Sequence, residues 1–202
     1  MKHLISLAIM IALITVVFSC KKEKIKPEPE GDSKVETYVV DARAYENWVY
    51  FSFDENKEVT IEDFKNSLDW DIAFHRFDVR VNCGTSGIGK GGSISMGKKD
   101  FETVEIAPTT GYSLNDSISI VNKPGGWQDQ VTVPGDTVMA KWLHFTGPPP
   151  QYNITNEIYV VKTAKGKYVK VWLKDYYNDN SETGYITMQY FYQKDGSTNL
   201  KE

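Results

Sequence analysis

The stretch that decides the fold covers residues 70–82 and reads WDIAFHRFDVRVN; residues 84–92 follow it as GTSGIGKGG. Strand side chains alternate between two faces, so the apolar residues at positions 70, 72 and 74 form one buried face. The apolar positions then move to 77, 79 and 81. Such a change of face needs an extra residue in the strand. We therefore expect one long strand with a β-bulge near His75 and Arg76, followed by a glycine-rich loop.

Strand-like runs recur through the rest of the chain. They are rich in Val, Ile, Thr, Tyr, Phe and Trp and are separated by Gly, Pro, Asn and Asp, which is the pattern of short strands joined by turns. We expect further strands at residues 35–41, 48–53, 59–61, 93–96, 101–106, 117–121, 130–133, 137–145, 158–163, 168–174 and 184–192. A hairpin is expected at residues 164–167, where Gly166 can adopt a positive φ.

One segment has a helical pattern. In residues 60–68, Ile61, Phe64 and Leu68 would fall on one face of a helix, and Thr60 could cap its N-terminus. The sequence contains no repeat of fixed period. The predicted fold class is therefore all-β, with a single antiparallel β domain and at most one short helix.

The N-terminus has the features of a bacterial lipoprotein signal. Lys2 precedes an apolar run at residues 4–18, and Ser19 and Cys20 follow it. The 15 residues of this run are fewer than the about 20 that a membrane span needs, but they suit the core of a signal peptide. We expect residues 1–19 to be a signal peptide and Cys20 to be lipidated. The alternatives are a short anchor helix or a signal that is cleaved elsewhere.

The segment that follows the predicted cleavage site is typical of a tether. After Cys20, residues 21–34 contain one apolar side chain among charged residues, prolines and glycine, so we expect a flexible tether at 20–34 and a β domain at 35–202. Loss of residues 1–19 removes one Lys and changes the formal net charge from −4 to −5, which argues against nucleic acid as a partner. Cys83 is the other cysteine, so no intramolecular disulfide is expected.

Motifs for nucleotide binding and catalysis are incomplete in this sequence. Gly87, Gly89 and Gly92 match a dinucleotide-binding pattern, but residues 93–96 alternate like a strand, whereas that pattern must open a helix. We expect the loop to make tight turns or a close backbone crossing instead. The sequence contains neither a Gly-x-Ser-x-Gly nor a His-Glu-x-x-His motif, so we predict that the protein is not an enzyme.

Residues 70–92 resemble the corresponding stretch of the HmuY-like lipoproteins of Bacteroidetes, and the resemblance continues through residues 156–163, 166–171 and 184–187. It implies an antiparallel β domain of the HmuY type and a haemophore-like protein that binds haem or a related porphyrin for iron acquisition. It also implies an outer-membrane lipoprotein that faces the periplasm or the cell surface. A TonB-dependent outer-membrane receptor is then a candidate partner.

The resemblance also implies where the axial ligands of a haem iron would lie, and this sequence departs from the family pattern there. In methionine-ligating relatives, one ligand lies on a loop that corresponds to residues 121–130. The other lies just before a Pro-Pro pair that corresponds to residues 147–150. Neither segment holds a Met or a His, and Pro148 stands where a ligand would be. Both ligands of the family pattern are therefore replaced.

Met139 and His144 are the candidate substitutes for these axial ligands. They are five positions apart and would face opposite sides of a strand; His144 is the better donor for iron. Trp127 and Tyr152 are aromatic residues on expected loops, and we predict that they and Pro148 line a slot for a flat ligand, either a porphyrin or a sugar. Local packing of these two aromatic residues is the alternative.

The sequence thus predicts a haem-binding lipoprotein of the HmuY type in which the axial ligands are replaced. The second hypothesis is a lipoprotein that retains the fold and binds a glycan or another non-haem partner. Neither hypothesis assigns a catalytic residue.

Overall fold

The computed structural model describes residues 33–147 and 151–202. The predicted signal peptide, Cys20, most of the predicted tether and Pro148 lie outside the described residues. The strands are β1 (Val35–Asp41), β2 (Val49–Ser52), β3 (Lys57–Val59), β4 (Ile72–His75), β5 (Asp78–Val81), β6 (Gly92–Lys98), β7 (Asp116–Ile120), β8 (Val131–Gly135), β9 (Leu143–Thr146), β10 (Gln151–Ile154), β11 (Glu157–Lys162), β12 (Tyr168–Tyr177) and β13 (Thr183–Gln193). Three short 3-10 turns accompany them, η1 (Gly84–Ser86), η2 (Phe101–Thr103) and η3 (Met139–Lys141). The described part of the chain contains no α-helix and its strands pair antiparallel, which confirms the all-β prediction.

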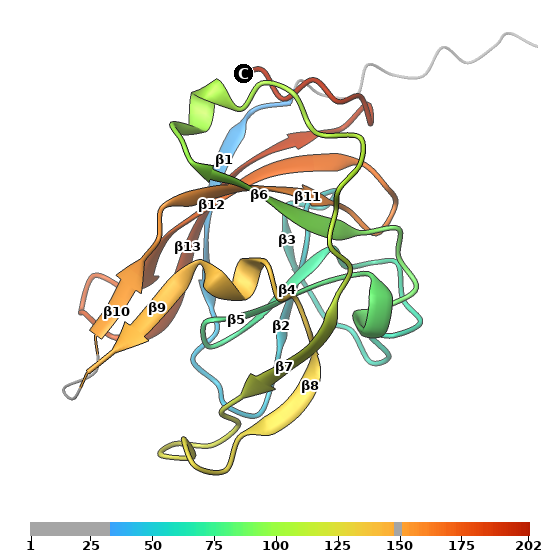
Figure 1. Ribbon diagram of the computed structural model, residues 1–202. Coiled ribbons are helices and arrows are strands. Elements are labelled where there is room, and N and C mark those ends of the chain that lie inside the picture. Colours follow the sequence, from blue (N-terminus) through green and yellow to red (C-terminus); the bar gives the residue numbers. More distant parts are fainter. Residues whose placement is uncertain (1–32, 148–150) are drawn as a thin grey trace, which may run out of the picture.

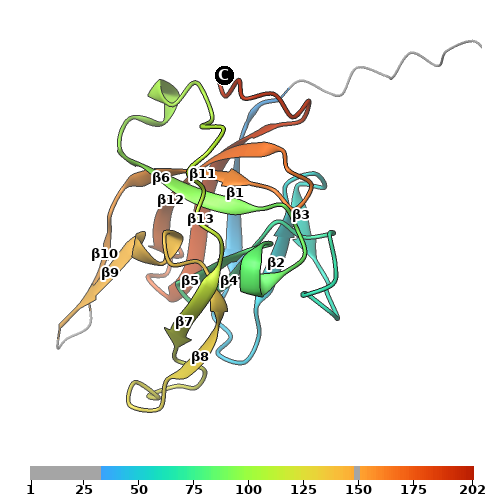
Figure 2. The same ribbon diagram turned by 45° about the vertical axis from the view of Figure 1, so that its right-hand side comes forward.

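The strands form two sheets and two separate hairpins (Figure 1). The larger sheet has the order β1-β13-β12-β11-β6, and the smaller sheet has the order β3-β2-β4-β5. The β7–β8 and β9–β10 hairpins project from the end of the molecule that is remote from the C-terminus (Figures 1 and 2). Ser33, the first described residue, lies near the C-terminal segment, because its hydroxyl donates to Gln193 Oε1 at 3.0 Å. The two ends of the described chain are therefore opposite the hairpins.

The larger sheet is buried on both faces. Tyr159 and Val161 of β11 pack in the main core between the two sheets. Ile158 and Val160 of the same strand pack in a second cluster on the outer face, which includes Phe101 of η2. Because alternate residues of a strand point to opposite faces, β11 is apolar at consecutive positions.

The prediction of a β-bulge at His75 and Arg76 is wrong. β4 and β5 instead form a hairpin in which His75 pairs with Asp78, and Arg76 and Phe77 make a two-residue turn. Arg76 has a φ of 51°, in the left-handed region of backbone conformation. The expected long strand is thus two short strands that run in opposite directions.

The register of this hairpin accounts for the shifted apolar pattern. Ile72 lies opposite Val81 and Phe74 lies opposite Val79, and all four side chains belong to the main core. A two-residue turn pairs an even-numbered residue with an odd-numbered one. The apolar positions therefore change from even to odd numbers without an extra residue in either strand.

The glycine-rich loop after β5 wraps closely around Asn82, which confirms the predicted close backbone crossing. The buried Asn82 Nδ2 donates to the carbonyl oxygens of Ser67 and Trp70, each at 2.9 Å. Its Oδ1 accepts a hydrogen bond from the Gly89 N–H at 3.0 Å. A Cβ at Gly89 or Gly91 would lie 2.4 or 2.5 Å from the Asn82 carbonyl oxygen. The loop therefore needs glycine at both positions.

The helix expected at residues 60–68 does not form, and this segment is a series of turns. Asp63 Oδ1 accepts from the Lys65 N–H at 3.2 Å, and Asp63 Oδ2 accepts from Asn66 Nδ2 at 2.7 Å. Such local bonds from an Asp side chain compete with a helix. Trp70 fixes the segment further, because its Nε1 donates to the Phe64 carbonyl at 2.9 Å.

Two expected strands also differ from the structure. Residues 101–106 begin with the η2 turn instead of a strand, and residues 137–145 begin with the η3 turn, so that only their last part belongs to β9. Asp136 explains the η3 turn, since its Oδ1 accepts from the N–H groups of Val138 and Met139 at 2.9 and 2.8 Å. This carboxylate caps a tight turn and prevents an extended backbone.

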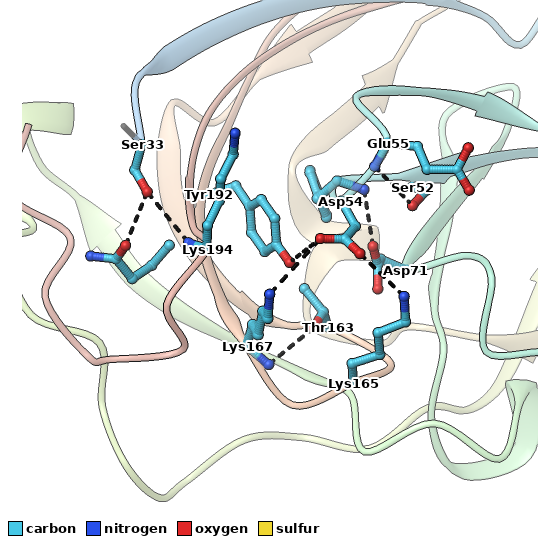
Figure 3. A network of polar contacts seen from close by, with 12 residues as sticks. Ser33, Ser52, Asp54, Glu55, Asp71, Thr163, Lys165, Lys167, Tyr192 and Lys194 are labelled. Carbon is cyan, nitrogen blue, oxygen red and sulfur yellow. Dashed lines mark hydrogen bonds and ion pairs between the residues drawn. The ribbon is translucent and has the colours of Figure 1, made fainter. Parts of the chain in front are cut away.

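The predicted hairpin at residues 164–167 is confirmed. Figure 3 shows Lys165 of this hairpin bonded to Asp54, which follows β2, and the buried carboxylate of Asp71 also ties the hairpin to the smaller sheet. Asp71 Oδ2 accepts from the Phe53 N–H at 2.9 Å, and Asp71 Oδ1 accepts from the Ala164 N–H at 3.0 Å. Burial raises the pKa of Asp71 to about 6, because the two backbone donors offset only part of the cost of burying its charge.

Candidate functional site

An aromatic contact joins the two projecting hairpins. Trp127, on the loop between β7 and β8, stacks on Phe145 of β9, with 4.7 Å between ring centroids and 18° between ring planes. Trp127 is 43% exposed and Phe145 is 38% exposed. Exposed apolar surface that is contributed by two separate elements is a typical mark of a binding site.

Tyr152 of β10 extends this aromatic contact toward the core. It lies opposite Phe145 in the β9–β10 register, so both rings are on one face of the hairpin, with centroids 5.4 Å apart. Its ring also lies 4.9 Å from Tyr176 and 6.1 Å from Phe77. Burial raises the pKa of Tyr152, and the positive charge of Arg76 offsets part of that rise. The site therefore has a continuous aromatic wall with a cation beside it.

A pocket lies against this aromatic wall. Its enclosed volume is only about 10 Å³, roughly the space of one water molecule. Its walls are formed by Tyr45, Arg76, Phe77, Asp78, Val121, Trp127 and Tyr152. Sites for small molecules usually measure about 300–1,000 Å³. A larger flat ligand would therefore have to separate the stacked rings of Trp127 and Phe145.

Arg76 provides the accessible positive charge of the pocket. Its Nη1 donates to the carbonyl oxygens of Arg43 and Thr183 at 3.1 and 3.4 Å, and its Nη2 donates to Thr183 Oγ1 at 2.9 Å. The guanidinium lies over the rings of Tyr45 and Tyr176, at 4.8 and 5.7 Å from their centroids. Within residues 33–147 and 151–202, no carboxylate forms an ion pair with it.

Asp78 and His75 form a buried pair next to Arg76. His75 Nδ1 lies 3.2 Å from Asp78 Oδ2, and His75 Nε2 lies 2.7 Å from the Tyr45 carbonyl oxygen. Because a carbonyl oxygen only accepts hydrogen bonds, Nε2 is the donor of that contact. Burial raises the pKa of Asp78, and its hydrogen bond with His75 and the nearby positive charge of Arg76 offset part of the rise.

The structure separates the two candidate iron ligands from the aromatic wall. Met139 is fully buried in the main core. His144 is exposed and lies opposite Asn153. Since neighbouring residues of a strand point to opposite faces, the side chain of His144 points away from the face that carries Phe145. Neither candidate ligand lines the pocket between the hairpins.

Of the other predicted site residues, Trp127 and Tyr152 do lie on the walls of one pocket. Pro148 lies outside the described residues. Sequence analysis does not identify Phe145 or Arg76. The alternation of β9 could have indicated Phe145, as the neighbour of His144 that faces the other side. No sequence signal indicates Arg76, because its role depends on segments that are distant in the chain.

The chemistry that this site can perform is binding of a flat ligand and of an anion. Aromatic faces stack on planar apolar groups, and a guanidinium without a carboxylate partner can bind an anionic group. In the part of the chain that the structure describes, no three His, Cys, Asp or Glu side chains are grouped to hold a metal ion. Across those same residues, no helix has the length and apolar character that a membrane crossing requires.

Comparison with known proteins identifies the family. The family model of the HmuY protein matches residues 44–190. A candidate HmuY-like haem-binding protein from Bacteroides vulgatus has a TM-score of 0.63 at 26% identity, covering 77% of this chain and 90% of that protein. An apo HmuY analogue from Tannerella forsythia shares the fold, with a TM-score of 0.64 at 23% identity, covering 80% and 97%. A search of curated protein sequences finds no match. The match over residues 44–190 shows that this chain belongs to the HmuY family.

Proposed function

We propose that the protein binds haem or a related porphyrin between its two hairpins, with Trp127, Phe145 and Tyr152 in contact with the macrocycle. The contact of Trp127 with Phe145 carries this proposal, because it gives both hairpins a part in one half-exposed aromatic surface. Flat apolar ligands stack well on such rings. Membership in the HmuY family and the likeness to the candidate haem-binding protein of Bacteroides vulgatus support it.

The side chains of the pocket fit a porphyrin plane but not a haem iron with two axial ligands. Met139 has 0% exposure, and His144 is on the face of the β9–β10 hairpin that is opposite Phe145. Neither side chain reaches the pocket in this arrangement. Because axial ligation contributes to haem binding, we propose an affinity lower than that of a site with two axial ligands.

The proposed setting is an outer-membrane lipoprotein that is anchored through Cys20 and serves iron acquisition. Ser33 hydrogen-bonds to Gln193, and Figure 1 shows the start of β1 at the end of the molecule that is remote from the hairpins. A flexible tether that precedes Ser33 would join the domain at the end opposite the hairpins, so the anchor itself would not cover the pocket. This attachment leaves the pocket accessible to a ligand and to a TonB-dependent receptor, whether the protein faces the periplasm or the cell surface.

A second function, binding of a glycan or another non-haem partner, is favoured by the mixed character of the pocket wall. Aromatic faces can stack on a sugar ring, and the charged groups of Arg76 and Asp78 can hydrogen-bond to hydroxyls. Such a ligand needs no iron ligand from the protein. A glycan array probed with the wild type and with Trp127→Ala tests this function, and signals that disappear in the variant would support it.

An absorbance titration with haem tests the first function. The chain without residues 1–19 and with Cys20→Ser is titrated with oxidised and then with reduced haem. We expect a Soret shift that saturates near one equivalent and is about tenfold weaker in Trp127→Ala, because one stacking face is lost. Trp172→Ala, which removes a tryptophan next to the second cluster, is the matched control. A spectrum indistinguishable from that of free haem would overturn the proposal.

A further inference from the structure

Arg76 has unused hydrogen-bonding capacity at the wall of the pocket. A guanidinium has five N–H donors, and the bonds to Arg43 and Thr183 use three of them. The Tyr152 hydroxyl is a further hydrogen-bond partner of the guanidinium, so at least one donor remains for a ligand. The three bonds and the contacts with the rings of Tyr45 and Tyr176 hold the group in one place, so a ligand would meet a guanidinium that is already ordered.

The neighbouring Arg43 shows what Arg76 lacks. Arg43 Nε and Nη2 donate to the two carboxylate oxygens of Asp41, each at 2.9 Å. This is the two-bond arrangement by which arginine recognises a carboxylate. Arg76 makes no such pair within the described residues. Its side chain is nevertheless half-buried.

Asp78 is the acidic side chain in the same pocket wall, and its effect must be weighed against that of Arg76. Only 10% of the Asp78 side chain is exposed, and its Oδ2 is already in contact with His75. Arg76 is more exposed than Asp78. Charge–charge interactions are strongest at short distance, and a ligand can contact the guanidinium more directly than the Asp78 carboxylate. The group of the ligand that binds here should therefore be negatively charged.

We propose that Arg76 binds a carboxylate of the ligand, and that the protein recognises the plane and the carboxylates of a porphyrin instead of its metal. This inference rests on the proposed function and names the ligand class more closely. The aromatic wall takes the flat ring, while the guanidinium takes a carboxylate at its rim. Since Met139 and His144 do not line the pocket, removing the iron removes no bond to either of them. A metal-free dicarboxylic porphyrin therefore binds as tightly as haem.

The experiment compares three probes on the chain that lacks residues 1–19 and carries Cys20→Ser. The probes are haem, metal-free protoporphyrin IX and the dimethyl ester of protoporphyrin IX, and binding is followed by quenching of tryptophan fluorescence. We expect haem and protoporphyrin IX to have dissociation constants within about threefold of each other. The ester should bind about tenfold more weakly, because charge-assisted hydrogen bonds are lost.

Variants at Arg76 and Arg43 assign the effect to one residue. Arg76→Gln should bind protoporphyrin IX about tenfold more weakly and should no longer distinguish it from the ester, because the charged partner is absent. Arg43→Gln removes the same charge from a neighbouring side chain that is already paired with Asp41, and it should leave binding within twofold of the wild type. Circular dichroism checks that both variants are folded.

The outcomes separate this inference from the proposed function. Binding of haem with protoporphyrin IX at least tenfold weaker would overturn the inference and leave haem binding in place. Equal binding of protoporphyrin IX and its ester by the wild type would also overturn it, even if Arg76→Gln failed to fold. Absence of binding by all three probes would overturn the proposed function itself.

Discussion

The two ends of the β4–β5 hairpin differ in how completely their polar side chains are hydrogen-bonded. At the end that follows Val81, the buried Asn82 uses its side-chain amide in three hydrogen bonds, and the glycine-rich loop closes over it without space for a side chain. At the turn, Arg76 keeps at least one N–H donor without an assigned partner and lies beside exposed aromatic rings. Saturated contacts at the first end stabilise the fold, while open contacts at the second end are available to a ligand.

The comparison predicts that the largest losses of stability come from the closed end. Gly89→Ala would place a Cβ 2.4 Å from the Asn82 carbonyl oxygen and 2.9 Å from Ala164 Cα. Both contacts are with backbone atoms, which cannot move without disturbing the sheet. We expect a loss of about 4 kcal/mol in the free energy of unfolding, measured by urea denaturation.

Gly97→Ala is the matched control for this substitution. Gly97 has a φ of 77°, but a Cβ there would meet no atom within 4 Å. Only the backbone conformation is unfavourable, so the loss should be about 1 kcal/mol. Equal losses for the two variants would show that crowding around Asn82 does not matter.

A second prediction concerns pH and the buried carboxyl group of Asp71. Its pKa is raised to about 6 in the folded protein, above about 3.9 in an unfolded chain. The folded state therefore binds this proton more tightly than the unfolded state does. The resulting contribution to the free energy of unfolding is fully present below about pH 4 and is lost as the pH rises through 6. The loss should be roughly 2–3 kcal/mol.

Asp71→Asn separates this effect from those of the other buried acids. Burial also raises the pKa of Asp78 and of Asp136, but these groups titrate equally in the wild type and in the variant. The difference in unfolding free energy between the two proteins should therefore change between pH 4 and pH 7 in the stated direction. A difference that is constant over this range would contradict the assignment to Asp71.

A third prediction tests the open end. Phe145→Ala should weaken porphyrin binding about tenfold and change the unfolding free energy by less than about 0.5 kcal/mol, because the ring is already 38% exposed. Phe101→Ala should do the reverse, since this ring is 2% exposed in the second cluster; we expect a loss of about 3 kcal/mol with unchanged binding. Fluorescence titration and urea denaturation measure the two effects.

The smallest expected effect is that of His144→Ala. The side chain of His144 is on the face of the β9–β10 hairpin that is opposite Phe145, so we expect haem binding to change by less than twofold. Loss of the Soret shift in this variant would show that His144 coordinates the iron, and that the β9–β10 hairpin rearranges when the ligand binds.

The sequence predicts the core of this fold well because the core depends on local alternation. Most strands lie within a few residues of the expected ones, and the glycine-rich loop makes the close backbone crossing that was one of its two expected features. The β4–β5 turn was missed for a physical reason: an odd shift in the apolar pattern fits a bulge or a two-residue turn equally well. The usual signal for such a turn, Asn-Gly or Asp-Gly, is absent, since Arg76 and Phe77 occupy it.

The candidate site is less predictable because it depends on contacts between distant segments. Trp127 and Tyr152 could be proposed as aromatic residues on loops, but Phe145 becomes part of the site only through the pairing of β9 with β10. Met139 lies in the η3 turn instead of the expected strand, because the Asp136 carboxylate caps a tight turn there. The alternation of apolar and polar residues at 137–145 does not indicate that a side-chain cap would favour a turn over a strand.

The left-handed backbone conformation at Arg76 implies a trade-off between the stability of the fold and ligand binding. The other described non-glycine residues with positive φ are Asn56, Asn156 and Ser181, which have short polar side chains; Asn in particular tolerates this conformation. An arginine there costs about 1–3 kcal/mol of backbone strain, which its bonds to Arg43 and Thr183 only partly offset. Selection for heat resistance alone would favour Gly or Asn at this position and discard the guanidinium, so a thermostable variant obtained in that way is expected to have lost its ligand.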